Sequence, residues 1–247
     1  MSESTTDLGA QAISKVAEMG ITSQLDEVDE LKVDVQTDPL KAVQGKIDSL
    51  SIEGTGMVIK EELRVEKMQL QTDAVSINPL KLAFGQVELL HPTTATTEVV
   101  LTESDLNRAF NSDFIRKKLQ DKLSLSLDET TGILEAQEIE FSLPEEDRIF
   151  ISSKFSDAGT GNIYPVSFTA KPQISADKQQ VTLEKIQYGE EKDTHPELTG
   201  MLIEQAHELL NLANFELDGM ELYLTDLKIK FGKMLLICQA EIEQFAT

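Results

Sequence analysis

The side chains that could do chemistry in this 247-residue chain include three histidines, one cysteine and 44 acidic residues. Glu204 and His207 form one E-x-x-H pair inside a stretch with helical spacing. A di-iron helical bundle needs two such pairs and further glutamates, and the sequence holds no second pair. We therefore interpret the pair as part of a solvated polar helix face and predict no metal site.

The remaining motifs give no support to catalysis either. His91 and His195 each precede a proline, and no G-x-S-x-G elbow supplies a nucleophile beside them. Gly54 and Gly56 lie in EGTGM, which lacks the third glycine of a dinucleotide fingerprint and leads into a strand pattern. A turn or strand kink is the better interpretation of these glycines. We predict a protein that is not an enzyme and uses no cofactor.

Charge and cysteine content exclude further classes of function. A net charge of −22 repels phosphate backbones and anionic bilayers, so nucleic-acid binding is not expected. Cys238 is the single cysteine, which excludes an internal disulfide and a multi-cysteine metal site. The N-terminus lacks a secretory pattern, and no window approaches about 20 apolar residues. We expect a cytoplasmic protein that acts at most at the periphery of a membrane.

The elements that would position any site begin with a helix. Apolar residues recur at helical spacing over residues 8–19, which predicts an N-terminal amphipathic helix within residues 1–22, packed on its own domain. From residue 31 to residue 101 the apolar period is two, typical of strands. Leu63 and Val65 share one strand face, whereas Met68 and Leu70 share the other. Such a change of phase is typical of a β-bulge, and bulges bend and twist a sheet.

A pair of helices is predicted after the first strands. Thr102 and Asp105 form a variant capping box, and Leu101 and Leu106 occupy the positions of a hydrophobic staple. Asn111 and Ser112 are expected to cap a second helical piece. Strands then return: residues 123–134 indicate a strand, a turn and the next strand, and further strands follow. The longest helix is predicted over residues 196–211, and a final hairpin over 215–231 and 234–242 turns at Gly232 and Lys233.

This order predicts an α+β fold: a long, strongly curved, mostly antiparallel sheet wrapped around one or two amphipathic helices, in one elongated domain spanning residues 1–247. One feature repeats within it. DPLKAVQGKIDSL starts at Asp38, and NPLKLAFGQVELL starts at Asn78. We interpret the repeat as architectural: Pro39 and Pro79 each end a strand, Gly45 and Gly85 each open the next, and an out-and-back pair of strands lies between the copies.

The two main helices carry wide apolar stripes beside these long strands. Such an arrangement either packs solid, as most stripes of this kind do, or leaves an apolar trough for an acyl chain. The candidate lipid-contacting residues are Leu106, Phe110, Phe114, Leu198, Met201, Leu202 and Leu209. Three hypotheses follow: a lipid-binding or lipid-transfer module, an interaction protein with a closed core that dimerises through a strand edge, and an enzyme on the same scaffold.

DPLKxxxGK, LTESDLNRAFNS and NFELDGM resemble the marks of the LmeA-like phospholipid-binding family, and the resemblance covers most of the chain. The resemblance implies a fold related to the tubular lipid-binding (TULIP) architecture, in which a curved sheet wraps a helix and holds lipid in an apolar groove. It therefore implies that the partner is a lipid, a phospholipid or another diacyl lipid. The strong acidity of the chain separately suggests transient contact with a membrane surface or a protein partner at the membrane. The resemblance implies no polar head-group site that maps onto particular residues.

Overall fold

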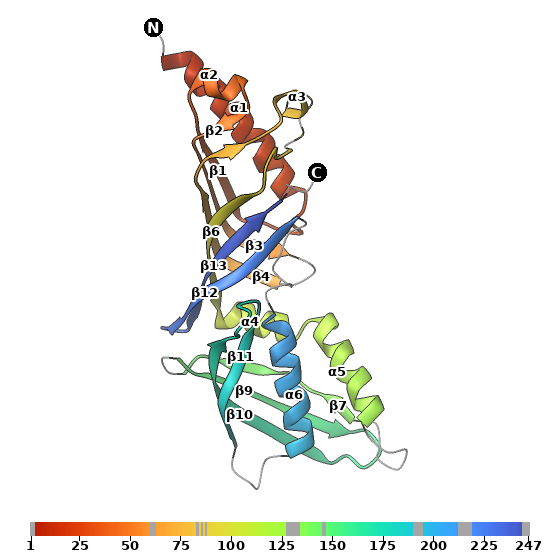
Figure 1. The fold of residues 1–247 in the computed structure, drawn as a ribbon. Coiled ribbons are helices and arrows are strands. Elements are labelled where there is room, and N and C mark those ends of the chain that lie inside the picture. Colours follow the sequence, from red (N-terminus) through yellow and green to blue (C-terminus); the bar gives the residue numbers. More distant parts are fainter. Residues whose placement is uncertain are drawn as a thin grey trace.

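The computed structural model of the protein describes residues 3–59, 63–82, 84, 86, 88–126, 134–144, 147–189, 195–211 and 219–243. Within these ranges the strands form two large antiparallel sheets and one small two-stranded sheet, and the helices lie against them (Figure 1). The coarse prediction of an α+β fold with a mostly antiparallel sheet is confirmed. Every helix in this part of the chain is too short or too polar to cross a membrane.

The first large sheet combines strands from both ends of the chain. In spatial order its strands are β1 (Glu30–Gln36), β3 (Ser49–Ile59), β4 (Leu63–Thr72), β6 (Thr93–Thr102), β13 (Lys233–Ile242) and β12 (Met220–Lys230). Helix α1 (Glu3–Thr22) packs on β1 and buries Ile13 and Ile21, which confirms the predicted N-terminal helix. Because β13 lies between β6 and β12, residues near the C-terminus complete a sheet that begins at residue 30.

The second large sheet uses only the middle of the chain. Its strands, in spatial order, are β11 (Val181–Tyr188), β10 (Ile163–Ile174), β9 (Ile149–Asp157) and β7 (Leu134–Ala136), and β8 (Glu140–Ser142) also pairs with β9. Helix α6 (Pro196–Leu209) packs on β10 and β11, and α5 (Asp113–Ser126) packs on β7 and α6. Helix α4 (Glu103–Phe110) lies between the two sheets (Figure 1).

The repeated sequence forms two similar turns of the chain, which we call corners: residues 38–48 and the described residues of 78–90. The copies form the short helices α2 (Pro39–Val43) and α3 (Pro79–Leu82), and the strands β2 (Lys46–Ile47) and β5 (Val75–Ser76) pair beside them. Asp38 Oδ1 accepts from Leu40 N at 2.9 Å, and Asn78 Oδ1 accepts from Leu80 N at 3.1 Å. The Asp-to-Asn exchange between the copies therefore preserves the same cap.

The first copy needs its glycine because the two copies touch. Gly45 has φ +72°, and a Cβ there would lie 2.0 Å from the Ile77 carbonyl oxygen and 3.1 Å from Pro79 Cδ. The predicted out-and-back pair is confirmed as β3 and β4, although each expected short connection is a helical turn. Gly85 of the second copy lies outside the described residues.

The change of phase in β4 has a different cause from the one predicted. Val65, Met68 and Leu70 are all buried, as the apolar pattern indicates. The register of β3 against β4 nevertheless runs without a shift from Leu50 to Ile59, so the prediction of a bulge here is wrong. The strand instead buries opposite faces in its two halves. Register shifts do occur between β12 and β13 and between β10 and β11.

A second correction concerns residues 123–134, predicted as strand, turn and strand. Helix α5 continues to Ser126, residues 127–133 lie outside the described part, and β7 begins only at Leu134. Ser112 Oγ accepts from Ile115 N at 3.3 Å, so the predicted second cap is confirmed. Once this cap has started the helix, each added residue gains a local hydrogen bond, and this outweighs the alternating LSLSL pattern.

The last two predicted elements are confirmed with adjusted ends. Helix α6 covers most of residues 196–211, and β12 and β13 form the final hairpin. The hairpin turns at Phe231 and Gly232, with φ 55° and 71°, rather than at Gly232 and Lys233. Two consecutive positive φ values fit the right-handed twist of the flanking strands. The predicted start of this hairpin at Phe215 lies outside the described residues.

Candidate functional site

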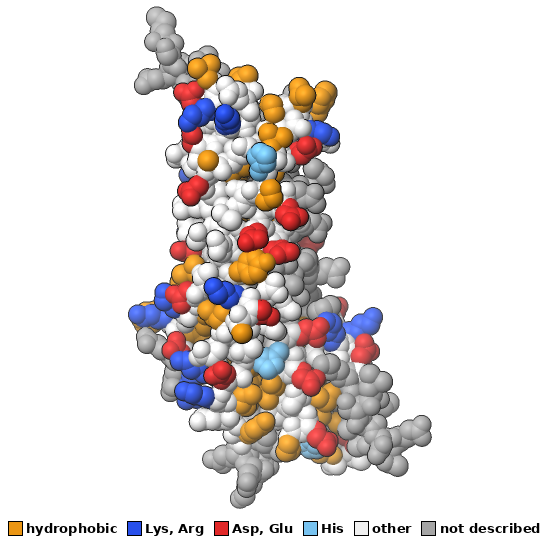
Figure 2. Space-filling view, in the orientation of Figure 1, with side chains coloured by type: hydrophobic (Ala, Val, Ile, Leu, Met, Phe, Trp, Pro, Cys, Tyr) orange, Lys and Arg blue, Asp and Glu red, His pale blue; other side chains and the backbone are white. Residues whose placement is uncertain are grey.

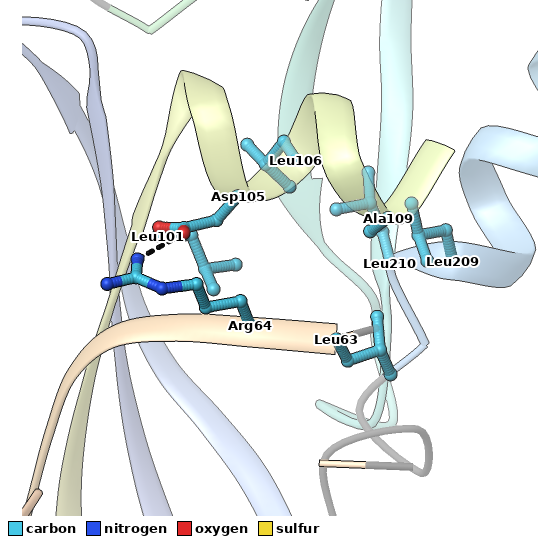
Figure 3. Close-up of a pocket in the computed structure, with 8 residues that line it drawn as sticks. All are labelled: Leu63, Arg64, Leu101, Asp105, Leu106, Ala109, Leu209 and Leu210. Atoms are coloured by element: carbon cyan, nitrogen blue, oxygen red, sulfur yellow. Dashed lines mark hydrogen bonds and ion pairs between the residues drawn. The ribbon is translucent and has the colours of Figure 1, made fainter. Parts of the chain in front are cut away.

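A small pocket lies where α4 and the end of α6 meet the first sheet (Figure 3). Its lining residues are Leu63 and Arg64 of β4, Leu101 of β6, Asp105, Leu106 and Ala109 of α4, and Leu209 and Leu210 at the end of α6. The cavity volume is about 10 Å³. A space of this size holds roughly one water molecule. The wall is apolar except for one charged pair.

Local sequence positions α4 at this pocket. The Thr102 hydroxyl accepts from Asp105 N at 3.1 Å, and Asp105 Oδ2 accepts from Thr102 N at 2.8 Å. The predicted capping box is therefore confirmed. Leu101 and Leu106, the predicted staple, are both buried and both line the pocket. The cap thus starts the helix and also places two apolar walls.

The charged pair joins α4 to the first sheet. Arg64 Nη1 lies 2.5 Å from Asp105 Oδ1, and the Asp105 side chain is only 2% exposed. Arg64 also reaches Glu66 at 3.1 Å and Asp29 at 3.6 Å. The hydrogen bond to Asp105 raises the pKa of Arg64, while desolvation opposes this shift. The Asp105 carboxylate thus lies directly against the Arg64 guanidinium, which compensates a buried charge.

Gly54 and Gly56 of EGTGM belong to the same junction. Gly56 has φ +57°, and a Cβ at this position would lie 1.9 Å from Asp29 Oδ2. The glycine therefore lets Asp29 approach β3 close to Arg64. The predicted strand kink is confirmed, and it places a carboxylate at this point.

Helix α4 is also joined to the second sheet, by polar side chains one turn apart. Asn107 accepts from Phe141 N and donates to Phe141 O, both at 2.8 Å. Asn111 does the same with Ile139, at 2.9 and 2.7 Å. Glu103 Oε1 accepts from Leu143 N at 2.5 Å. The polar positions of LTESDLNRAFNS thus pair with the edge of the β8 segment, as a neighbouring strand would.

The seven predicted lipid-contacting residues are distributed over this region and the core. Leu106 and Leu209 line the pocket. Phe110 is fully buried and stacks on Phe141, with ring centroids 5.4 Å apart. The remaining four are placed as follows: Leu198 and Leu202 are buried, Met201 is half-buried against the core, and the side chain of Phe114 lies outside the described part.

Sequence reasoning missed two polar residues in this region. No sequence signal distinguishes Arg64 from Lys67, because the pairing with Asp105 depends on an approach across 41 residues. Gln205 was also missed. It is completely buried in α6, and neither its amide nitrogen nor its amide oxygen has a hydrogen-bond partner among the residues that the structure describes. Gln205 lies one turn before Leu209 on the same helix face.

His207 has a structural role. His207 Nε2 accepts from Leu183 N at 3.0 Å, so the ring is neutral there and carries its proton on Nδ1. Burial lowers the pKa of His207. The interpretation of this helix face as simply solvated is therefore wrong for His207, although Glu204 is exposed. No group of three or more His, Cys, Asp or Glu side chains placed for a metal ion occurs in the part of the chain that the structure describes.

Comparison with known proteins identifies a family. The family described as LmeA-like phospholipid-binding matches residues 5–239, a range that includes the second sheet, the two corners, the pocket and all of the first sheet except the last three residues of β13. No curated protein and no solved structure matches the chain. The family match covers nearly the whole sequence. The chain belongs to the LmeA-like phospholipid-binding family.

Proposed function

We propose that the protein binds a phospholipid or another diacyl lipid without chemical conversion, with acyl chains lying between α4, α6 and the first sheet. The observation that carries this proposal is the apolar pocket at the meeting point of these elements, in a chain of a phospholipid-binding family. Six of its eight lining residues are Leu or Ala. Burial of an acyl chain contributes about 0.8 kcal/mol per CH₂, so no covalent step is required.

An acyl chain needs far more space than about 10 Å³, so one wall must move on binding. Helix α4 is the less mobile wall, because charged and amide hydrogen bonds join it to both sheets. Helix α6 meets α4 through apolar side chains such as Leu209. Two polar side chains of α6 contact other elements: Glu208 pairs with Lys118 of α5, and His207 pairs with β11. We propose that α6 separates from α4 to admit the lipid.

Gln205 supports this location. A buried amide without partners costs roughly 1–3 kcal/mol, so such groups are retained only rarely. A lipid ester or phosphate oxygen near α6 would accept from the amide nitrogen. Leu209, one turn further along the same face, already lines the pocket. In this proposal the lipid lies along α6, with its acyl chain at the pocket and one of its oxygen atoms at the Gln205 amide.

Native mass spectrometry of gently purified protein tests the proposal. We expect species that carry one lipid mass, and displacement of that lipid by an acyl fluorophore. Gln205→Met is the diagnostic variant, because methionine has a similar length and no unpaired polar group. If lipid contacts the amide, Gln205→Met lowers lipid occupancy. Wild-type protein that is consistently free of lipid and ignores the fluorophore would contradict the proposal.

The small cavity favours a second candidate, an interaction protein with a closed core. In that case Gln205→Met raises the free energy of unfolding by roughly 1–3 kcal/mol and has no ligand to lose. A homodimer through an exposed strand edge belongs to this candidate. Analytical ultracentrifugation of lipid-free protein distinguishes the two: a stable dimer favours the closed core, and a monomer favours the lipid-binding function.

The finer features of the family resemblance belong to the same proposal. We propose that the sheets are curved as in TULIP proteins and that the molecule is elongated along the direction from the first sheet to the second. We also propose that the protein transfers lipid between membranes. We further propose a cytoplasmic site of action at the periphery of a membrane. The buried thiol of Cys238, whose pKa burial raises to about 11, is compatible with a reducing compartment.

A further inference from the structure

Exposed apolar side chains gather at the end of the molecule that carries α2 and α3 (Figure 2). Four of them project from the two corners: Leu40 is 76% exposed, Val43 79%, Leu80 75% and Phe84 84%. Leu40 and Leu80 occupy equivalent positions of the repeat. The corners adjoin, since Gly45 of the first meets Pro79 of the second. Two neighbouring corners therefore present matched apolar tips.

Several backbone N–H groups of these corners already have hydrogen-bond acceptors within the protein. The Leu40 and Leu80 N–H groups donate to the Asp38 and Asn78 side chains. Gly45 N donates to Ala42 O at 2.9 Å, and Phe84 N donates to Lys81 O at 2.9 Å. The proline that opens each corner has no N–H to satisfy. Backbone groups that are already paired enter hydrocarbon at much lower cost than free ones.

Charge at the corners differs from charge on the chain as a whole. Between residues 38 and 48, Lys41 and Lys46 balance Asp38 and Asp48. Between residues 78 and 90, Lys81 balances Glu88. Both corners are therefore neutral on a chain with a net charge of −22. Lys41 pairs with Asp48 at 2.6 Å, and Lys81 lies 3.9 Å from Glu88, so each lysine lies beside an acidic residue of its own corner.

We propose that this pair of corners, formed by α2 and α3, inserts its apolar tips into the interface of a phospholipid bilayer. Convex tips with neutral bases suit a zwitterionic bilayer, where apolar side chains enter the acyl boundary and lysines reach phosphates. The inference rests on the proposed function, because lipid exchange requires contact with a membrane.

The absence of tryptophan provides a direct test. Phe84→Trp places a single fluorophore at a corner. Phe231→Trp is the matched control, since Phe231 is also highly exposed but lies at the β12–β13 turn next to the start of α4. With phosphatidylcholine vesicles, we expect emission from position 84 to move to shorter wavelength and to be quenched by brominated acyl chains, and emission from position 231 to stay unchanged. Equal responses at both positions, or none at position 84, would overturn the proposal.

Vesicle flotation measures how much the apolar tips contribute to membrane binding. Leu40→Ser with Leu80→Ser removes two exposed side chains, so folding is expected to be unaffected and partition onto phosphatidylcholine vesicles to fall at least about tenfold. Phe231→Ser is expected to partition as wild type. Anionic vesicles are expected to bind less protein at low salt and more as salt rises, because the chain is acidic. Binding that strengthens on anionic vesicles at low salt would overturn the neutral-corner mechanism.

Lipid occupancy of the same variants separates this inference from the proposed function. If the interior binds lipid but the corners do not insert, Leu40→Ser/Leu80→Ser retains bound lipid and floats like wild type. If the corners insert but the interior is closed, the tryptophan at position 84 responds while native mass spectrometry finds no lipid. Normal circular dichroism and thermal unfolding of each variant exclude misfolding as the cause.

Discussion

Among single residues, Arg64 and Asp105 form the charged contact that joins the first sheet to α4. Its carboxylate is almost fully buried and also caps α4. Asp105→Asn keeps the shape of the side chain but removes the buried negative charge that compensates Arg64. We expect the free energy of unfolding to fall by roughly 3 kcal/mol, measured by urea denaturation.

Glu53→Gln is the control for this prediction. Glu53 pairs with Lys67 at 2.7 Å on the same sheet, but both side chains are substantially exposed. Loss of an exposed pair of this kind is expected to cost much less than loss of the Asp105 contact, because solvent screens both charges. Equal losses from the two substitutions would show that burial of Asp105 does not determine the strength of its contact.

His207 predicts a pH dependence of stability. Burial lowers its folded-state pKa below the ordinary value of 6.5, so the unfolded chain binds its proton more readily. Stability from His207 is therefore complete above the unfolded pKa and is lost as pH falls through it towards the folded pKa. Protonation also removes the lone pair that accepts from Leu183 N.

His207→Gln isolates this contribution, because glutamine offers an acceptor that does not titrate near neutrality. Urea unfolding at about pH 7.5 and about pH 5.5 is the measurement. We expect the wild type to lose more stability than the variant over this interval. The many carboxylates titrate in both proteins, so only the difference between them reports on His207. Parallel losses would assign the pH dependence to other groups.

At the scale of elements, α4 is the connection between the sheets. Asn107 and Asn111 each make two hydrogen bonds to backbone groups that would otherwise be an unpaired strand edge. Asn107→Ala and Asn111→Ala are each expected to lower the free energy of unfolding by roughly 1–3 kcal/mol. Faster amide hydrogen exchange at Phe141 or Ile139 is expected to accompany the loss.

Asn162→Ala is the matched control for these two variants, because Asn162 is an exposed asparagine in a loop. It is expected to change stability by less than about 0.5 kcal/mol. If Asn107→Ala were equally mild and left exchange at Phe141 unchanged, α4 would be held to the second sheet by apolar packing alone.

The difference between the two ends of α4 explains what the sequence could predict. The capping box and the staple involve residues at most five positions apart, so the sequence reveals them. The asparagine contacts span 28 and 34 residues, and nothing near Asn107 or Asn111 indicates a strand edge as their partner. The strand prediction for residues 123–127 failed for a related reason: a local alternating pattern does not reveal that a helix has already begun upstream.

At the scale of the whole molecule, the sequence predicts the strands but not their assignment to sheets. Hydrophobic alternation in β13 is clear, yet it does not specify β6 and β12 as neighbours. The candidate site was predictable to the same extent. Leu106 and Leu209 follow from helical stripes, whereas Leu63, Arg64 and Leu210 enter the pocket only because three distant segments converge.

The position of β13 has a consequence for synthesis of the chain. β6 ends at Thr102, but its partner begins at Lys233, so the ribosome makes the whole second sheet before β6 gains its second neighbour. The middle of the chain is therefore able to fold first, while the earlier strands wait with one open edge. Such an edge can pair with another nascent chain. The edge of β6 therefore stays open until β13 has been made and pairs with it.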